Sequence, residues 1–184
     1  MNGWSAGQNS TQTGKRHWKK ARFCCGMING VAAGAGASIA FACDMRIAAH
    51  SAKFIQAFVK VGLIPDSGAC WLLPRLAGFG RAFELALTGD AITAEMAHQW
   101  GLVNQVVSEE ALQDTARQLA LKLAQGPTKA IGLIKRAMNK AMTVDFDDYL
   151  AYEADLQEIA GRSEDYREGV SAFLEKRTAQ FTGK

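Results

Sequence analysis

Several features that mark particular classes of protein are scarce or missing in this sequence. No uninterrupted apolar run approaches the roughly 18 residues that a membrane span needs, so we expect no membrane partner. The N-terminus lacks the charged and then apolar pattern of a secretory signal, which favours a cytoplasmic protein. The content of 48% hydrophobic and 21% charged residues argues against a disordered or fibrous protein, and 184 residues are enough for one domain with a sizeable core.

Metal-binding and serine-hydrolase motifs are also missing. The four cysteines form no Cys-x-x-Cys pair, and the three histidines are isolated from them and from one another, so we expect no metal site and free thiols. There is no Gly-x-Ser-x-Gly elbow, which argues against a serine hydrolase.

Positive charge is concentrated at one end of the chain. Residues 1–22 contain five basic and no acidic residues, whereas the net charge of the whole sequence is +3. Taking these five from the 21 basic residues leaves 16 against 18 acidic residues, a net charge of −2 for the rest. Because nucleic-acid binding needs a concentrated basic face, the body of the chain is not expected to bind nucleic acid.

The sequence divides into three stretches. Residues 1–25 show no helical or strand period and are interpreted as a poorly ordered or non-native lead. Residues 26–107 alternate between strand and helix patterns, and residues 108–184 are mainly helical, which predicts an α/β core followed by a helical region. The expected strands are 45–49 and 102–107; the expected helices are 37–43, 71–76, 81–87, 94–100, one between Ser108 and Gly126, 127–142, 146–160 and 163–176.

A cluster of small residues, Gly34-Ala35-Gly36-Ala37-Ser38, is the first candidate site. It contains Gly-x-Gly but lacks the third glycine of a dinucleotide fingerprint and the Gly-Lys-Ser/Thr of a phosphate loop. Two interpretations are equally favoured. The small residues let a helix pack closely on a sheet, or a helix starting near Ala35 directs backbone N–H groups at an anionic oxygen of a substrate.

Asp66 is the second candidate. It follows Pro65 in a turn with apolar residues on both sides, so its carboxylate is expected to lose hydration, which suits proton transfer near neutral pH. The alternative is that Asp66 caps the following helix, and from the residues alone the cap is favoured.

The ordered motifs from Ile28 onward closely resemble the crotonase (enoyl-CoA hydratase/isomerase) superfamily. The matching segments are Ile28–Ser38, Ala42-Cys43-Asp44, Ser51–Phe54, Gly62–Asp66, Leu87-Thr88-Gly89, Trp100–Val103 and Glu168–Arg177. Pro65-Asp66 and the C-terminal tail look most like members that isomerise a phenylacetate-derived ring epoxide. The resemblance implies repeated ββα turns of a superhelix followed by helices that build trimers or pairs of trimers.

The resemblance also implies a chemistry. Members bind acyl-CoA thioesters, need no separate cofactor and hold the thioester oxygen between two backbone N–H groups, the second of which maps onto Ala35. Ser38 and Phe58 occupy the positions of the two glutamates with which hydratases activate water. Members with an aspartate at the position of Asp66 use it as base or nucleophile. This favours isomerisation and a catalytic Asp66 over a cap.

The resemblance assigns further residues to the site. Gly34, Gly36 and Phe58 map to the substrate site, and Lys176 maps to a lysine near the CoA phosphates. Members carry roughly a hundred further residues before Asn29-Gly30, including the first oxyanion donor. Gln8 faintly matches that donor, but residues 1–25 are interpreted as a truncated or out-of-frame start.

These features together predict an acyl-CoA isomerase in the breakdown of phenylacetate or fatty acids. It would act on a phenylacetate-derived ring epoxide or a 3-enoyl CoA thioester and assemble as a homotrimer or hexamer. The alternatives are a 2-enoyl-CoA hydratase and an inactive fragment that only oligomerises.

Overall fold

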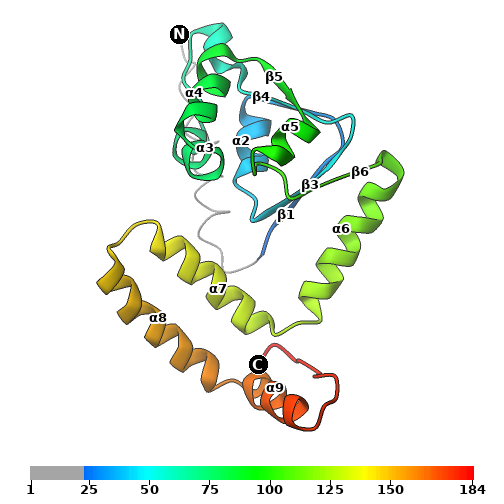
Figure 1. Ribbon diagram of the computed structural model, residues 1–184, viewed down its shortest axis with the longest axis vertical. Coiled ribbons are helices and arrows are strands. Elements are labelled where there is room, and N and C mark those ends of the chain that lie inside the picture. The colour runs from blue at the N-terminus through cyan, green and yellow to red at the C-terminus, as the bar shows by residue number, and fades with distance from the viewer. Residues whose placement is uncertain (1–22) are drawn as a thin grey trace, which may run out of the picture. The chain divides into compact units, whose positions relative to one another are not determined.

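The computed structural model describes residues 23–184, which form two compact units (Figure 1). Of these, one unit contains residues 24–117, and the other contains Phe23 and residues 118–184. The first unit contains all the strands of the described chain and both sequence motifs that predicted a site. Residues 1–22, which hold Gln8, lie outside the described residues.

The strands of the first unit form two small sheets, and the first four strands along the chain belong to them alternately. One sheet is parallel, in the order β1 (Cys25–Ile28), β3 (Met45–Ala49), β6 (Gln105–Val107). In the other, β2 (Val31–Ala33) pairs in parallel with β4 (Lys53–Ile55), and β4 pairs in antiparallel fashion with β5 (Ala91–Thr93). Two strands, one in each sheet, therefore precede helix α2 (Ala35–Phe41) and two more precede the 3-10 helix η1 (Ala57–Val61).

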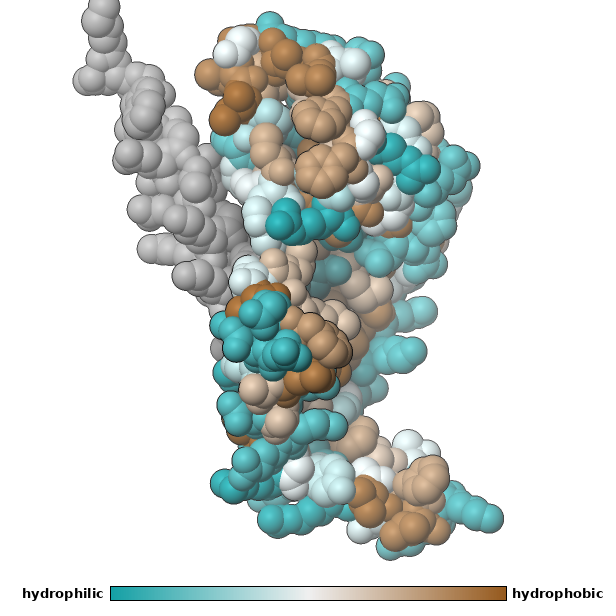
Figure 2. All heavy atoms as spheres, turned by 60° about the vertical axis from the view of Figure 1, so that its left-hand side comes forward, coloured by the Kyte–Doolittle hydropathy of each residue, from teal (hydrophilic) through white to brown (hydrophobic). Residues whose placement is uncertain are grey.

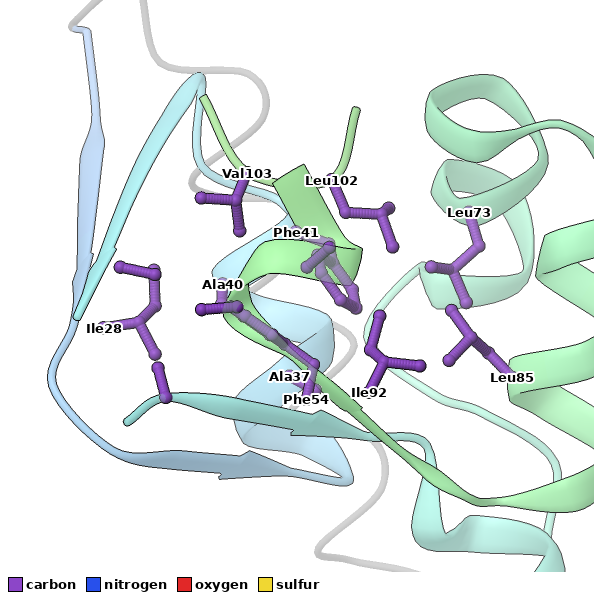
Figure 3. Packing of buried hydrophobic residues seen from close by; sticks show 14 of the residues in the cluster. Ile28, Ala37, Ala40, Phe41, Phe54, Leu73, Leu85, Ile92, Leu102 and Val103 are labelled. Carbon is purple, nitrogen blue, oxygen red and sulfur yellow. The ribbon is translucent and has the colours of Figure 1, made fainter. Parts of the chain in front are cut away.

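Helix α2 is held in the core by its small residues. Ala37 is fully buried and Ala40 nearly so, which lets the helix backbone approach its neighbours closely. Phe41 at its end stacks on Phe54 of β4 with ring centroids 5.4 Å apart (Figure 3). Further core residues come from α3 (Ala69–Ala77), α4 (Phe79–Thr88), α5 (Ala94–Gln99) and the strands β1, β3 and β5.

The helix ends follow the capping residues. The Thr93 hydroxyl accepts a hydrogen bond from the Met96 N–H at 3.2 Å, and Gly101 follows α5 with φ of 77°. The predicted strand 102–107 is too long: Leu102 and Val103 are buried, but their N–H groups bond to the Ala97 carbonyl, so β6 begins only at Gln105. The predicted helix 37–43 begins two residues earlier, at Ala35.

Helix α6 (Glu109–Ala124) begins in the first unit and ends in the second. In the second unit, α7 (Thr128–Ala141) and α8 (Phe146–Gly161) lie side by side, followed by α9 (Glu164–Leu174) (Figure 1). The buried Asp165 carboxylate accepts hydrogen bonds from the Thr182 and Gly183 N–H groups, which fixes the C-terminal segment on α9. No helix within residues 23–184 is long and apolar enough to cross a membrane.

Candidate functional site

The entrance to α2 depends on an unusual backbone conformation. Gly34 has φ of 53° and ψ of −124°, a region that only glycine occupies without strain. Its N–H donates to the Ile55 carbonyl of β4 at 2.8 Å, so the turn continues the strand pairing before the chain reverses. Ala35 is then the first residue of α2, where backbone N–H groups have no carbonyl partner within the helix. The Ala35 N–H, which was predicted as an oxyanion donor, therefore lies at the start of α2.

Phe58 lies against this turn. A Cβ atom at Gly34 would be 3.7 Å from Cζ of the Phe58 ring, an ordinary van der Waals distance, so the Phe58 ring lies beside Gly34. Phe58 is half-buried in η1. Gly36 lies one residue into α2 and is exposed, and a Cβ there would meet open space. The predicted residues Gly34, Ala35, Gly36 and Phe58 are thus brought to one end of α2.

Ser38 is tied into the backbone of its own helix. It is fully buried, and its hydroxyl donates to the Gly34 carbonyl at 3.2 Å. A serine that bonds one turn back in this way has its proton engaged by a main-chain oxygen. Ser38 is therefore a structural residue of α2 and is not placed to activate water.

Asp66 lies in the turn that leads into α3. It is half-buried, and its carboxylate Oδ1 is shielded from solvent. Its carbonyl accepts a hydrogen bond from the Ala69 N–H at 3.0 Å, but the N-cap position of α3 is Gly68. The interpretation of Asp66 as the N-cap is wrong, because the turn extends two residues beyond it. Helix α3 packs on α2; Ala35 is the first residue of α2, and Asp66 lies in the turn before α3.

Ser67, the next residue, was not predicted as a site residue. It has φ of 53°, which is strained for a residue other than glycine, and it is only 4% exposed. Its hydroxyl has no hydrogen-bond partner among the described residues. The amide of Gln56, before η1, is likewise buried without a partner there. The dipeptide Ser67-Gly68 indicates a turn, but nothing in the sequence indicates a buried hydroxyl.

The opposite end of α2 is held by a buried arginine. The Arg46 side chain, 4% exposed, donates to the carbonyls of Phe41, Cys43 and Leu102, with 2.6 Å between Nε and the Leu102 oxygen. Burial lowers the pKa of Arg46. Burial and a hydrogen bond with the Cys24 thiol, whose sulfur lies 3.5 Å away, raise the pKa of Cys43 to about 12. These contacts join the end of α2 to the segment before β6.

The remaining predicted residues lie elsewhere. Lys176 is in the second unit, exposed, just after α9, with φ of 54° and its N–H bonded to the Phe173 carbonyl. Gln8 is outside the described residues. Among residues 23–184, no group of three or more His, Cys, Asp and Glu side chains could hold a metal ion.

Comparisons with known proteins agree on one family. The pattern of the enoyl-CoA hydratase/isomerase family matches residues 6–184. The chain is 60% identical over 157 residues to a 1,2-epoxyphenylacetyl-CoA isomerase of Escherichia coli, covering 85% of this chain and 60% of that protein. It is 46% identical to a probable enoyl-CoA hydratase of Rhodobacter capsulatus, and the match covers 85% of this chain and 61% of that protein. The chain thus spans about 60% of the length of these curated relatives.

Solved structures give the same result. An enoyl-CoA hydratase from Bacillus anthracis superposes on the whole chain with a TM-score of 0.95 at 35% identity, and the match covers 72% of that protein. The predicted fold class, an α/β crotonase-like fold, is confirmed by this likeness.

Proposed function

The chain belongs to the enoyl-CoA hydratase/isomerase family, and we propose that it is an acyl-CoA isomerase. In the proposed reaction, the Asp66 carboxylate removes a proton from the carbon next to the thioester. The electrons of the broken C–H bond delocalise onto the thioester oxygen, and the Ala35 N–H stabilises the resulting enolate. Asp66 then returns the proton to another carbon, so the product has the atoms of the substrate. Coenzyme A is part of the substrate, and no further cofactor takes part.

The placement of the Asp66 carboxylate is the main support for this proposal. Ser38 is engaged with the Gly34 carbonyl, and Phe58 presents an apolar ring, so neither position supplies a base. Asp66 combines a partly buried carboxylate with a place before a helix that packs on α2. A single carboxyl group suffices for proton transfer between two carbons, whereas the family's hydratases use two to activate and position water.

The substrate class proposed is a phenylacetate-derived ring epoxide or a 3-enoyl group, carried as a CoA thioester. The 60% identity to a protein named 1,2-epoxyphenylacetyl-CoA isomerase supports the first of these. The test is to incubate the purified chain with 1,2-epoxyphenylacetyl-CoA and examine the products by liquid chromatography and mass spectrometry. We expect a product of unchanged mass and altered retention time. Recovery of unaltered ester alone would contradict the proposed substrate.

A 2-enoyl-CoA hydratase is the second candidate. It is favoured by the names of relatives such as the probable hydratase at 46% identity and of the solved structures. Its signature in the same experiment, with a 2-enoyl-CoA as substrate, is a product heavier by one water.

We also propose that the second unit forms the contacts of a homotrimer or hexamer. Its exposed apolar side chains include Phe173, at 82% exposure, and Leu174, at 73%, and brown patches are visible on the face drawn in Figure 2. An apolar groove of about 410 Å³ between α7, α8, α9 and the C-terminal segment includes Ala160, Val170 and Phe181. Exposed apolar surface of this kind is typical of protein–protein contacts.

A further inference from the structure

Ser67 combines two unfavourable features directly beside Asp66. The Ser67 hydroxyl is buried and has no hydrogen-bond partner within residues 23–184, so it loses its hydration and gains no hydrogen bond from them in return. A φ of 53° adds backbone strain at the same residue. Such features persist where the surrounding structure imposes them, and they concentrate at ligand-binding and catalytic sites. This pairing points to a ligand group that completes the hydrogen bonding of Ser67.

The hydroxyl supplies a function that the neighbouring carboxylate lacks. An ionised carboxylate only accepts hydrogen bonds, whereas a serine hydroxyl can donate one. Because the Cα atoms of consecutive residues lie about 3.8 Å apart, one small group of a bound substrate can reach both side chains. The carboxylate would act on a C–H bond while the hydroxyl binds an oxygen atom nearby.

We propose that the Ser67 hydroxyl donates a hydrogen bond to an oxygen on the acyl group of the substrate, at the position of a ring epoxide. This assignment rests on the proposed function, in which the Ala35 N–H binds the thioester oxygen. Ser67 thus contacts a second oxygen, which ring-epoxide esters have and simple 3-enoyl esters lack. Ser67 is therefore a specificity residue that favours oxygen-bearing acyl groups.

The test measures binding, so it does not depend on turnover. Isothermal calorimetry would compare 2-hydroxyphenylacetyl-CoA with phenylacetyl-CoA on the full 184-residue chain. One neutral hydrogen bond corresponds to about a fivefold difference in dissociation constant, so the hydroxylated ester should bind about fivefold tighter. Ser67→Ala should remove this preference. Ser67→Gly should do the same while relieving the positive φ, so backbone strain and loss of the hydroxyl are separated.

Gln56→Leu is the matched control, because it removes the other buried polar side chain without a partner among the described residues. It should keep the preference of the parent chain. The assignment is overturned if the parent chain shows no preference, if the preference survives in both Ser67 variants, if Gln56→Leu abolishes it, or if neither ester binds.

Catalysis separates this inference from the proposed function. A Ser67-dependent binding preference in a chain that isomerises no ester would retain the assignment and refute the proposed function. A chain that isomerises a 3-enoyl-CoA but shows no Ser67-dependent binding preference would support the proposed function and refute the Ser67 assignment. In an active chain, Ser67→Ala should lower kcat/KM for 1,2-epoxyphenylacetyl-CoA about tenfold or more and leave the value for a 3-enoyl-CoA nearly unchanged.

Discussion

At the scale of single residues, the proposed reaction depends most on the Asp66 carboxylate. Asp66→Asn preserves the size of the side chain but removes the base. We expect turnover of an acyl-CoA substrate to fall about 100-fold or more, while the dissociation constant of a CoA ester stays nearly unchanged. Steady-state kinetics together with calorimetry would measure both quantities.

Asp90→Asn is the matched control. Asp90 is an exposed aspartate of the same unit, and its Oδ1 lies 3.9 Å from Nζ of Lys60. It should retain the turnover of the parent chain. Near-normal turnover in Asp66→Asn would mean that another group moves the proton.

The sequence located some residues of this region and missed others for a physical reason. Gly34 and Asp66 were identified because glycine clusters and a Pro-Asp turn leave a local pattern. Ser67 and Gln56 were missed, because burial without a partner depends on which side chains the fold brings around them. The alternative interpretation of Asp66 as a helix cap was wrong because the N-cap position of α3 is Gly68.

At the scale of elements, Arg46 joins α2 to the segment before β6. Arg46→Met removes the donor from three carbonyls, and we expect the free energy of unfolding to fall by about 3 kcal/mol. Arg46→Lys should recover little of this loss, because an ammonium group cannot reproduce the planar fork. Urea denaturation followed by circular dichroism measures the change.

Arg75→Met, at an exposed arginine, is the control. An equal fall in the free energy of unfolding in that variant would refute the role given to Arg46.

A second element-scale contact fixes the C-terminal segment to α9. The Arg177 guanidinium donates to both carboxylate oxygens of Glu168, at 2.6 and 3.0 Å. The Gln180 N–H donates to Oε1 of the same carboxylate at 2.8 Å. These bonds lower the pKa of Glu168 from 4.5 to about 2. Because the folded-state pKa is depressed, the stabilisation is present above pH 4.5 and is lost as the pH falls toward 2.

The chemical shift of the Gln180 amide should therefore titrate with a midpoint near 2. In Arg177→Met the midpoint should move up toward 4.5, since the largest cause of the shift is gone. A midpoint that stays in place without Arg177 would assign the shift to another cause.

Long periodic helices could be predicted, whereas short elements could not. The helices from α6 to α9 follow apolar spacing, and the structure adds that the side chains of Asp145 and Ser163 cap α8 and α9. Strand β5 has three residues with Ile92 alone buried, which is too short to show a period. It exists because Phe54 and Ile92 pair across β4 and β5, a tertiary contact.

At the scale of the whole molecule, the apolar surface of the second unit bears on assembly. We expect the purified chain to be a trimer or larger by light scattering. Phe173→Asp places a charge on a residue that is 82% exposed, so folding should be retained while the mass in solution falls. Phe79→Asp, at an exposed phenylalanine of the first unit, should leave the mass unchanged. A monomeric parent chain would refute the assembly.

In the reaction proposed for this chain, a proton moves between carbons and no water is added. The most direct measurement compares two rates on one preparation of the purified chain: isomerisation of 3-hexenoyl-CoA and hydration of crotonyl-CoA, both followed by ultraviolet absorbance. With Ser38 and Phe58 unable to activate water, we predict measurable isomerisation and negligible hydration. Hydration as fast as isomerisation, or faster, would contradict the account.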